Sequence, residues 1–156
     1  VSRHKQFLYG LTARLVGNPD DALDLVQEAF VSAHAALKRY DRDRPMRTWL
    51  ARIAINKARD WRRKERVRAV LRSVLPLGDA PDVAADQVSV EQEVSDRAEL
   101  DDVRRQIARM PAKLREVLVL RTIEGLPQVQ VAEMLGISEK SVETRLYRAR
   151  RHLAER

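Results

Sequence analysis

The spacing of apolar side chains predicts helices along most of this chain, because they recur every three or four residues. The first helix is expected over 3–16, and its apolar face is Phe7 or Leu8, Leu11 and Leu15. The second runs from Pro19 to about Lys38, and its core stripe is Leu23, Val26, Phe30, Ala33 and Leu37. The third covers about 46–72, with the buried stripe Leu50, Ala54, Ala58 and Trp61.

Residues 73–96 interrupt this pattern. Two prolines and a glycine stop the long helix, and the remainder is acidic and weakly hydrophobic, which predicts a flexible linker. Helical periodicity then returns, with the apolar positions Leu100, Val103 and Ile107, followed by Leu114, Val117, Leu118 and Leu120. We therefore divide the chain into a helical domain of residues 1–72, an acidic linker of 73–96 and a second helical domain of 97–156.

The last two predicted helices are short and are joined by a tight turn. Gly136 lies where a helix C-terminus favours a residue tolerant of positive φ, and Ser138 is placed to cap the next helix. The buried stripe of that helix is Val142, Leu146, Ala149 and Leu153. Its opposite face presents Lys140, Ser141, Thr144, Arg145, Arg148 and Arg151. This pattern predicts a helix-turn-helix facing a DNA major groove; the alternative is a solvated surface helix of an ordinary bundle.

Composition favours an all-α protein. Of 156 residues, only 5 are Gly, 6 are Pro and 4% are aromatic, while 34% are charged. The absence of Cys excludes disulfides and thiolate metal sites. No apolar run approaches the length of a membrane span and no signal peptide is visible, so we expect a cytoplasmic protein that does not itself insert into a membrane.

The net charge of +7 is unevenly distributed. Residues 1–72 contain 17 Lys/Arg and 8 Asp/Glu, a net charge of +9, whereas 73–96 contain 6 Asp/Glu and no Lys/Arg. Residues 97–156 contain 13 Lys/Arg and 9 Asp/Glu, a net charge of +4. Two basic blocks therefore flank an acidic one, and a polyanion is the expected partner of the two ends.

The third helix combines a basic run with residues that suit unpaired DNA. Eight cationic side chains lie between Lys57 and Arg72, which is typical of phosphate binding without base reading. Tyr40 and Trp49 add flat rings that stack on unpaired bases, and the amide of Asn56 is suited to reading a base edge. For Trp49 a purely core position is an equal alternative.

An enzyme is not indicated. The sequence shows no Gly-rich phosphate loop, no pair of metal ligands at useful spacing and no catalytic triad, so we expect neither cofactor nor metal. On the second helix, Asp24, Gln27 and Glu28 lie beside Leu25 and Val31, which we take to be exposed. Taken alone, these acids indicate solvation; the two apolar neighbours weakly favour a partner surface.

Five stretches taken in order resemble the extracytoplasmic-function sigma factors of bacterial RNA polymerase. They are NPDDALDLVQEAF at 18–30, RTWLARIAIN at 47–56, MPAKLREVLVLR at 110–121 with EGL at 124–126, AEMLGIS at 132–138 and RLYRAR at 145–150. Each motif is moderately specific, and the ordered set, which covers nearly the whole chain, is strong. The resemblance implies an initiation factor that brings core polymerase to promoters, and an anti-sigma factor as its regulator.

The resemblance also implies roles for matching positions. Polymerase core would be contacted through its β′ clamp helices and β flap, with the clamp-helix surface formed by Asp24, Leu25, Gln27, Glu28 and Val31. The melted minus-ten element and the duplex beside it would be contacted by Tyr40, Arg47, Trp49, Asn56, Lys57, Asp60, Arg63 and Lys64. The minus-thirty-five element would be contacted by Lys140, Ser141, Glu143, Thr144, Arg145, Arg148 and Arg151. The acidic linker resembles the segment that threads toward the polymerase active-site cleft.

Two positions depart from the family pattern. Glu143 stands where many members have Lys or Arg, and its carboxylate suits a cytosine amino group better than a phosphate. Pro127 stands where a Ser often caps the helix. Two other classes remain as alternatives. A stand-alone helix-turn-helix regulator would leave the Trp49–Asn56 region unexplained, and a sigma-like protein that sequesters an anti-sigma factor would not need the basic 57–72 face.

Overall fold

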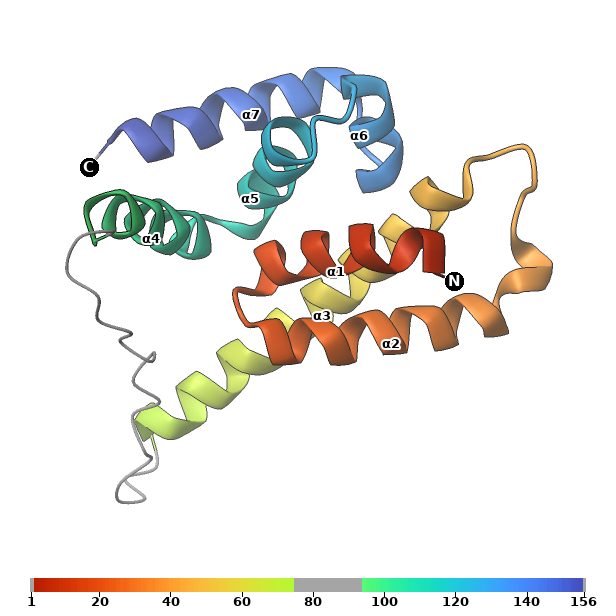
Figure 1. Ribbon diagram of the computed structural model, residues 1–156, viewed down its shortest axis with the longest axis horizontal. Helices are drawn as coiled ribbons and strands as arrows, with labels where there is room; N and C mark the ends of the chain where they lie inside the picture. The colour runs from red at the N-terminus through yellow and green to blue at the C-terminus, as the bar shows by residue number, and fades with distance from the viewer. Residues whose placement is uncertain (1, 75–93, 156) are drawn as a thin grey trace.

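The computed structural model describes residues 2–74 and 94–155, which are helical and form two lobes (Figure 1). The first lobe contains α1 (Ser2–Val16), α2 (Pro19–Ala35), the 3₁₀ turn η1 (Leu37–Arg39) and α3 (Met46–Val74). The second contains α4 (Val94–Arg109), α5 (Ala112–Leu118), the π-helical turn η2 (Val119–Ile123), α6 (Gln128–Leu135) and α7 (Glu139–Ala154). The all-α class with two helical units is as predicted.

Local signals in the sequence set the helix ends. The Asn18 side chain accepts hydrogen bonds from the backbone N–H groups of Asp20 and Asp21, at 3.0 and 3.2 Å, and so caps α2. Gly136 adopts a φ of 67° directly after α6, as the predicted turn requires. The Ser138 hydroxyl accepts from the Ser141 backbone N–H at 3.1 Å and caps α7. These three predictions are confirmed.

Some boundaries differ from the predicted ones. α2 ends at Ala35, and η1 occupies the last turn that was expected to belong to it. Residues 73 and 74 of the predicted linker extend α3, and residues 94–96 begin α4. The rest of the predicted linker, 75–93, lies outside the described residues.

The buried face of α2 is rotated from the predicted stripe. Its buried residues are Ala22, Leu25, Val26, Ala29 and Ala33. Leu23 and Leu37, predicted to be core, are 40% and 51% exposed. Leu25, predicted to be exposed, is only 5% exposed, so it packs inside the lobe and is not available to a polymerase. The cause is steric. The small alanines let α2 pack closely against α1 and α3, so the side of α2 that carries them faces the core, although Leu23 and Leu37 are larger.

The hydrophobic core does not stop at the boundary between the lobes. One cluster lies inside the first lobe and contains Leu8, Val26, Ala29, Ala33, Leu50 and Ala54. A second cluster joins Leu11, Leu15 and Ile55 of the first lobe to Val117 and Leu120 of the second. The two units are therefore packed against each other through an apolar interface.

Arg115 is the largest fully buried side chain in the described residues and stands at this interface. Its guanidinium donates to the carbonyl of Leu15 at 3.2 Å, to those of Ile107 and Ala108 at 2.6 and 2.7 Å, and to that of Met110. Leu15 lies in the last turn of α1, and Ile107 and Ala108 lie in the last turn of α4. Because the last carbonyls of a helix lack partners and carry partial negative charge, one cation stabilises two helix ends at once.

Candidate nucleic-acid interface

The helix-turn-helix is built as the sequence predicts. Val131, Ala132 and Leu135 of α6 and Val142, Leu146 and Ala149 of α7 are buried. The turn closes with a hydrogen bond from the Ile137 N–H to the Ala132 carbonyl at 3.0 Å. Its tightness fixes the angle between the two helices, and this angle determines what α7 presents to a partner.

The residues predicted to contact the minus-thirty-five element lie on α7 outside its buried stripe, with Arg145 at the edge that faces the first lobe. Lys140, Glu143, Arg148 and Arg151 are exposed, and Ser141, Thr144 and Arg145 are half-buried. Glu143 lies 4.0 Å from Lys140, and Arg151 pairs with Glu155 at 3.0 Å. The face is cationic overall, with one carboxylate near its N-terminal end, where a recognition helix reads bases.

A second face lies along α3, in the first lobe. Trp49, Asn56, Asp60, Arg63 and Lys64 share one side of the helix, because they are spaced by three, four or seven residues. Asn56, Asp60, Arg63 and Lys64 are exposed, and Lys57 is half-buried beside them. Asp60 and Arg63 form an ion pair at 3.8 Å. The helix thus presents an aromatic ring, an amide and then cations in a single line.

The aromatic end of this line is a ring pair. The rings of Tyr40 and Trp49 lie 4.8 Å apart between centroids and are tilted by 39°. The Tyr40 hydroxyl donates to the carbonyl of Arg44, which holds the loop before α3 against the pair. Trp49 is half-buried and packs on the core of the first lobe, and part of its side chain remains accessible.

Arg47 does not lie on the α3 face that carries Trp49 and Asn56. Its guanidinium carbon lies 3.8 Å from the centre of the Phe7 ring on α1, a cation–π contact. Residues two apart on a helix face different directions, so Arg47 and Trp49 are on different sides of α3.

The predicted polymerase surface on α2 is largely accessible. Asp24, Gln27 and Glu28 are exposed, and Val31 is 72% exposed. Leu25 is the exception, because it belongs to the buried stripe described above.

The sequence did not reveal the contacts between the lobes. Arg59 on α3 donates two hydrogen bonds to Glu116 on α5, at 2.7 and 2.8 Å. These bonds raise the pKa of Arg59, against the opposing effect of its partial burial. Arg62 donates to the Leu15 carbonyl at 2.9 Å, and burial, with the nearby charge of Arg66, lowers its pKa. No sequence signal distinguishes these arginines from their neighbours in the basic run, because their partners are distant in the chain.

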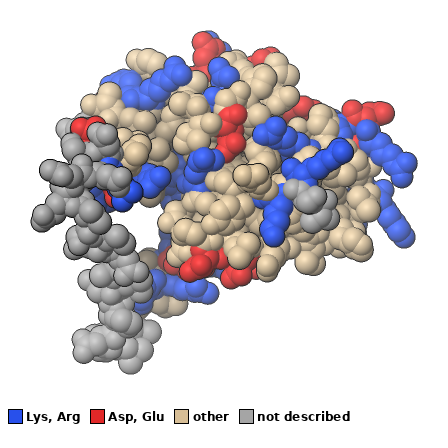
Figure 2. Space-filling model, viewed as in Figure 1, with Lys and Arg blue, Asp and Glu red and all other residues tan. Residues whose placement is uncertain are grey.

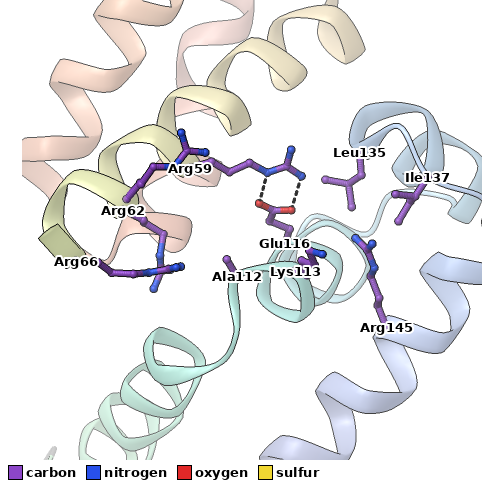
Figure 3. Close-up of a pocket in the computed structure, with 10 residues that line it drawn as sticks. Arg59, Arg62, Arg66, Ala112, Lys113, Glu116, Leu135, Ile137 and Arg145 are labelled. Carbon is purple, nitrogen blue, oxygen red and sulfur yellow. Dashed lines mark hydrogen bonds and ion pairs between the residues drawn. The ribbon is translucent and has the colours of Figure 1, made fainter.

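These side chains border a cleft between the lobes (Figure 3). Arg59, Arg62, Arg63 and Arg66 come from α3, Lys113 and Glu116 from α5, and Arg145 from α7. Arg63 and Arg145, predicted to contact different promoter elements, therefore face one cleft. Lys and Arg side chains also lie on both lobes over the face seen in Figure 2.

Within residues 2–74 and 94–155, no three His, Cys, Asp or Glu side chains are grouped so as to hold a metal ion. Over the same ranges, no helix has the length and apolar character that crossing a membrane requires.

The fold is that of a helix-turn-helix DNA-binding protein with a second helical lobe attached. Residues 1–68 match the family model of sigma-70 region 2, and residues 100–153 match that of sigma-70 region 4. The chain is 44% identical to the RNA polymerase sigma factor CnrH of Cupriavidus metallidurans, over 99% of this chain and 82% of CnrH. It is 32% identical to the ECF RNA polymerase sigma factor SigW of Bacillus subtilis, over 98% and 84%. The chain belongs to the extracytoplasmic-function (ECF) sigma factors, which are initiation factors and not enzymes.

Solved structures agree with this assignment. The structure of CnrH in complex with the cytosolic domain of CnrY matches with a TM-score of 0.69 and 34% identity, covering 99% of this chain and 82% of that one. The sigma factor RpoE of Bartonella quintana, in complex with the anti-sigma factor NepR, matches with a TM-score of 0.71. At 22% identity, over 97% of this chain and 89% of that one, it supports the fold alone.

Proposed function

We propose that this ECF sigma factor guides polymerase core to promoters through three separate surfaces on one chain. The α2 surface of Asp24, Gln27, Glu28 and Val31 binds the β′ clamp helices, and the helix-turn-helix lobe lies near the β flap. The α3 line of Trp49, Asn56, Asp60, Arg63 and Lys64 holds the melted minus-ten element. The outward face of α7 reads the minus-thirty-five element. Because it works on polymerase, we place the protein in the cytoplasm.

The observation that supports this proposal most strongly is the order of side chains along α3. A ring pair, an exposed amide and a cationic stretch follow one another on one helix face. Rings stack on unpaired bases, an amide reads a base edge, and cations hold phosphates of the adjoining duplex. A duplex-only regulator needs the last of these and not the first two, so the combination favours a protein that holds opened DNA.

The packed lobes are not the state we expect on a promoter. The two elements are about 25 base pairs apart, as their names state, or roughly 85 Å along B-form DNA. Arg63 and Arg145 line a single cleft when the lobes are packed, so they cannot reach both elements together. Promoter engagement therefore requires the lobes to separate, and neither lobe needs high affinity alone, because the tether keeps each one near its site.

We also propose an anti-sigma factor as the regulatory partner. The CnrH structure that this chain resembles holds the cytosolic domain of CnrY. We propose that such a partner stabilises the packed arrangement of the two lobes. In that arrangement Arg63 and Arg145, which are assigned to promoter DNA, both border the cleft between the lobes.

Run-off transcription tests the proposal. The purified chain is mixed with core polymerase and a genomic promoter library, and transcripts are sequenced from their 5′ ends. We expect defined start sites that share two upstream elements. Binding to DNA without any new start site would favour the stand-alone regulator. Failure to bind either core polymerase or DNA, together with capture by an anti-sigma factor, would favour the sequestering protein.

A further inference from the structure

The cleft between the lobes is a half-open cavity of about 430 Å³. It is bordered by four helices, α3, α5, α6 and α7, and by the turn after α6. This volume is within the range of pockets that hold small molecules, about 300–1,000 Å³, and is far too small for a DNA duplex.

The charge of the cavity is strongly positive. Six cationic side chains border it, and they are Arg59, Arg62, Arg63, Arg66, Lys113 and Arg145. The one carboxylate, that of Glu116, is already occupied by both hydrogen bonds from Arg59. Among the side chains described in residues 3–74 and 97–155, none forms an ion pair with Arg66, Lys113 or Arg145. The lowered pKa of Arg62, caused by burial and by Arg66, agrees with an excess of positive charge here.

The walls of the cavity differ from each other. The arginines of α3 line one side, while Leu135 and Ile137 border the opposite side, at the turn of the helix-turn-helix (Figure 3). Ala112, at the start of α5, adds a small apolar surface between them. Such a cavity suits a compact anion, and its apolar side leaves room for a flat ring attached to that anion.

We propose that this inter-lobe cleft is a binding site for a small molecule with two or more linked phosphates, as in a nucleotide or a short inorganic polyphosphate. The guanidinium fork matches phosphate oxygens in pairs, and several forks from different helices suit several linked phosphates better than a single anion. The ligand would bridge α3, α5 and α7 and so stabilise the packed state of the lobes. Binding to the free chain does not depend on the function proposed above.

One consequence does rest on that function. Because Arg63 and Arg145 border the cavity and are also assigned to promoter DNA, a bound polyphosphate and an engaged promoter would exclude each other. The binding test uses the free chain without polymerase or DNA, so its failure would leave the promoter proposal standing.

The test is calorimetric titration of the full chain at fixed ionic strength of about 150 mM, where weak surface attraction is screened. The probes are adenosine triphosphate, sodium tripolyphosphate and adenosine monophosphate, in separate titrations. We expect saturable binding of one triphosphate per chain and affinity at least about tenfold weaker for the monophosphate. Tighter binding of adenosine triphosphate than of tripolyphosphate would identify a nucleotide as the ligand, and equal binding an inorganic chain.

Matched variants assign the site. The double variant Arg66→Gln and Lys113→Gln removes two exposed cations of the cleft that hold no ion pair, so the fold should be retained. We expect it to bind adenosine triphosphate about tenfold more weakly. Arg68→Gln removes a cation of the same helix that pairs with Glu65 at 2.9 Å outside the cleft, and it should bind as the parent does. Thermal melts followed by circular dichroism confirm that each variant is folded.

Three results would overturn the proposal. The first is no saturable binding of any triphosphate up to about 1 mM, a level at which even weak specific sites fill. The second is equal loss of affinity in Arg68→Gln and in the double variant, which would mean general surface attraction. The third is equal competition by a polyglutamate peptide, which would indicate a docking surface for an acidic polypeptide.

Discussion

Arg59 of α3 holds Glu116 of α5 with two parallel hydrogen bonds, at 2.7 and 2.8 Å, across the interface between the lobes. Glu116 is 4% exposed, whereas Arg59 is 39% exposed. Arg59 also donates to the Asn56 amide oxygen at 3.4 Å. A single guanidinium therefore contacts both Asn56, which is proposed to read an unpaired base, and the buried carboxylate of α5 in the second lobe.

The first prediction concerns this ion pair. Glu116→Gln removes a buried negative charge and leaves Arg59 among four other cleft cations on α3 and α5. Breaking one partner of a buried pair is costly, and because Arg59 is partly exposed we expect a loss of about 2 kcal/mol in the free energy of unfolding. The lobes should also separate more often, which small-angle X-ray scattering would record as a larger radius of gyration.

Glu65→Gln is the matched control for that variant. Glu65 pairs with Arg68 at 2.9 Å and with Arg72 at 3.9 Å, all within α3, so its loss cannot affect contact between the lobes. An unchanged radius of gyration and an unchanged unfolding midpoint in Glu116→Gln would show that the pair does not fasten the lobes.

Sequence periodicity was a good guide wherever one helix face was apolar and its ends had clear signals. Leu8, Leu11 and Leu15 were placed correctly, and so was the stripe of α7. On α2 it was only partly right: Val26 and Ala33 are buried as predicted, but Leu23 and Leu37 are exposed, and a competing stripe with Ala22 and Ala29 is buried. Close packing against neighbouring helices decides between them, and that information is absent from the helix itself.

The interface between the lobes was beyond sequence reasoning for a different reason. Arg59 and Glu116 are 57 residues apart, and each sits in a segment where its charge has an ordinary explanation. The role of Arg115 is even harder to predict. Its partners are backbone carbonyls of α1 and α4, and because every residue has a carbonyl, the sequence does not indicate which ones it will contact. The side chains assigned to DNA could be placed on shared helix faces from the sequence because they are neighbours on single helices, whereas the cleft depends on the tertiary arrangement.

The second prediction tests the polymerase surface. Asp24→Arg reverses an exposed charge within the proposed contact on α2 and should weaken binding to core polymerase at least about tenfold, because a contact built for a carboxylate would then meet a cation. Biolayer interferometry with purified core polymerase measures the affinity. Glu99→Arg, the same reversal at an exposed position of α4, is the control and should bind as the parent does. If Asp24→Arg and the parent bind core polymerase with equal affinity, this surface of α2 is not part of the interface.

The third prediction separates base reading from phosphate binding on α3. Asn56→Ala removes an exposed amide and should reduce discrimination at one base of the melted strand by about 1–3 kcal/mol. The measurement is fluorescence anisotropy of holoenzyme on oligonucleotides that carry an upstream duplex and a single-stranded minus-ten element and that differ at one unpaired base. Lys64→Gln is the comparison: losing this exposed cation should weaken binding to every sequence alike and reduce the salt dependence. A flat loss across all bases in Asn56→Ala would reassign Asn56 to positioning the strand.

The last prediction concerns Glu143, an acid on an otherwise basic reading face. Its side chain is 65% exposed and lies 4.0 Å from Lys140, near the N-terminal end of α7, where recognition helices reach base edges. A carboxylate accepts from the amino group of cytosine, whereas a lysine donates to the acceptors of guanine. Glu143→Lys should therefore change the preferred base at one minus-thirty-five position, by about 1–3 kcal/mol, and raise affinity for all duplexes through an added phosphate contact.

The measurement for Glu143→Lys is competitive binding to a duplex library randomised over the upstream element. Glu155→Lys is the matched charge change at the far end of the same helix; it releases Arg151, its partner at 3.0 Å. Both variants gain the same positive charge, so both should bind duplex DNA more tightly and with a steeper salt dependence. Only Glu143→Lys should alter the sequence logo, because positions 151 and 155 lie about three turns or more from the N-terminal end of α7, where the released Arg151 can contact phosphates but not base edges. Identical logos for the parent and Glu143→Lys would mean that this carboxylate faces solvent in the complex, and that upstream specificity comes from Ser141, Thr144 and the arginines alone.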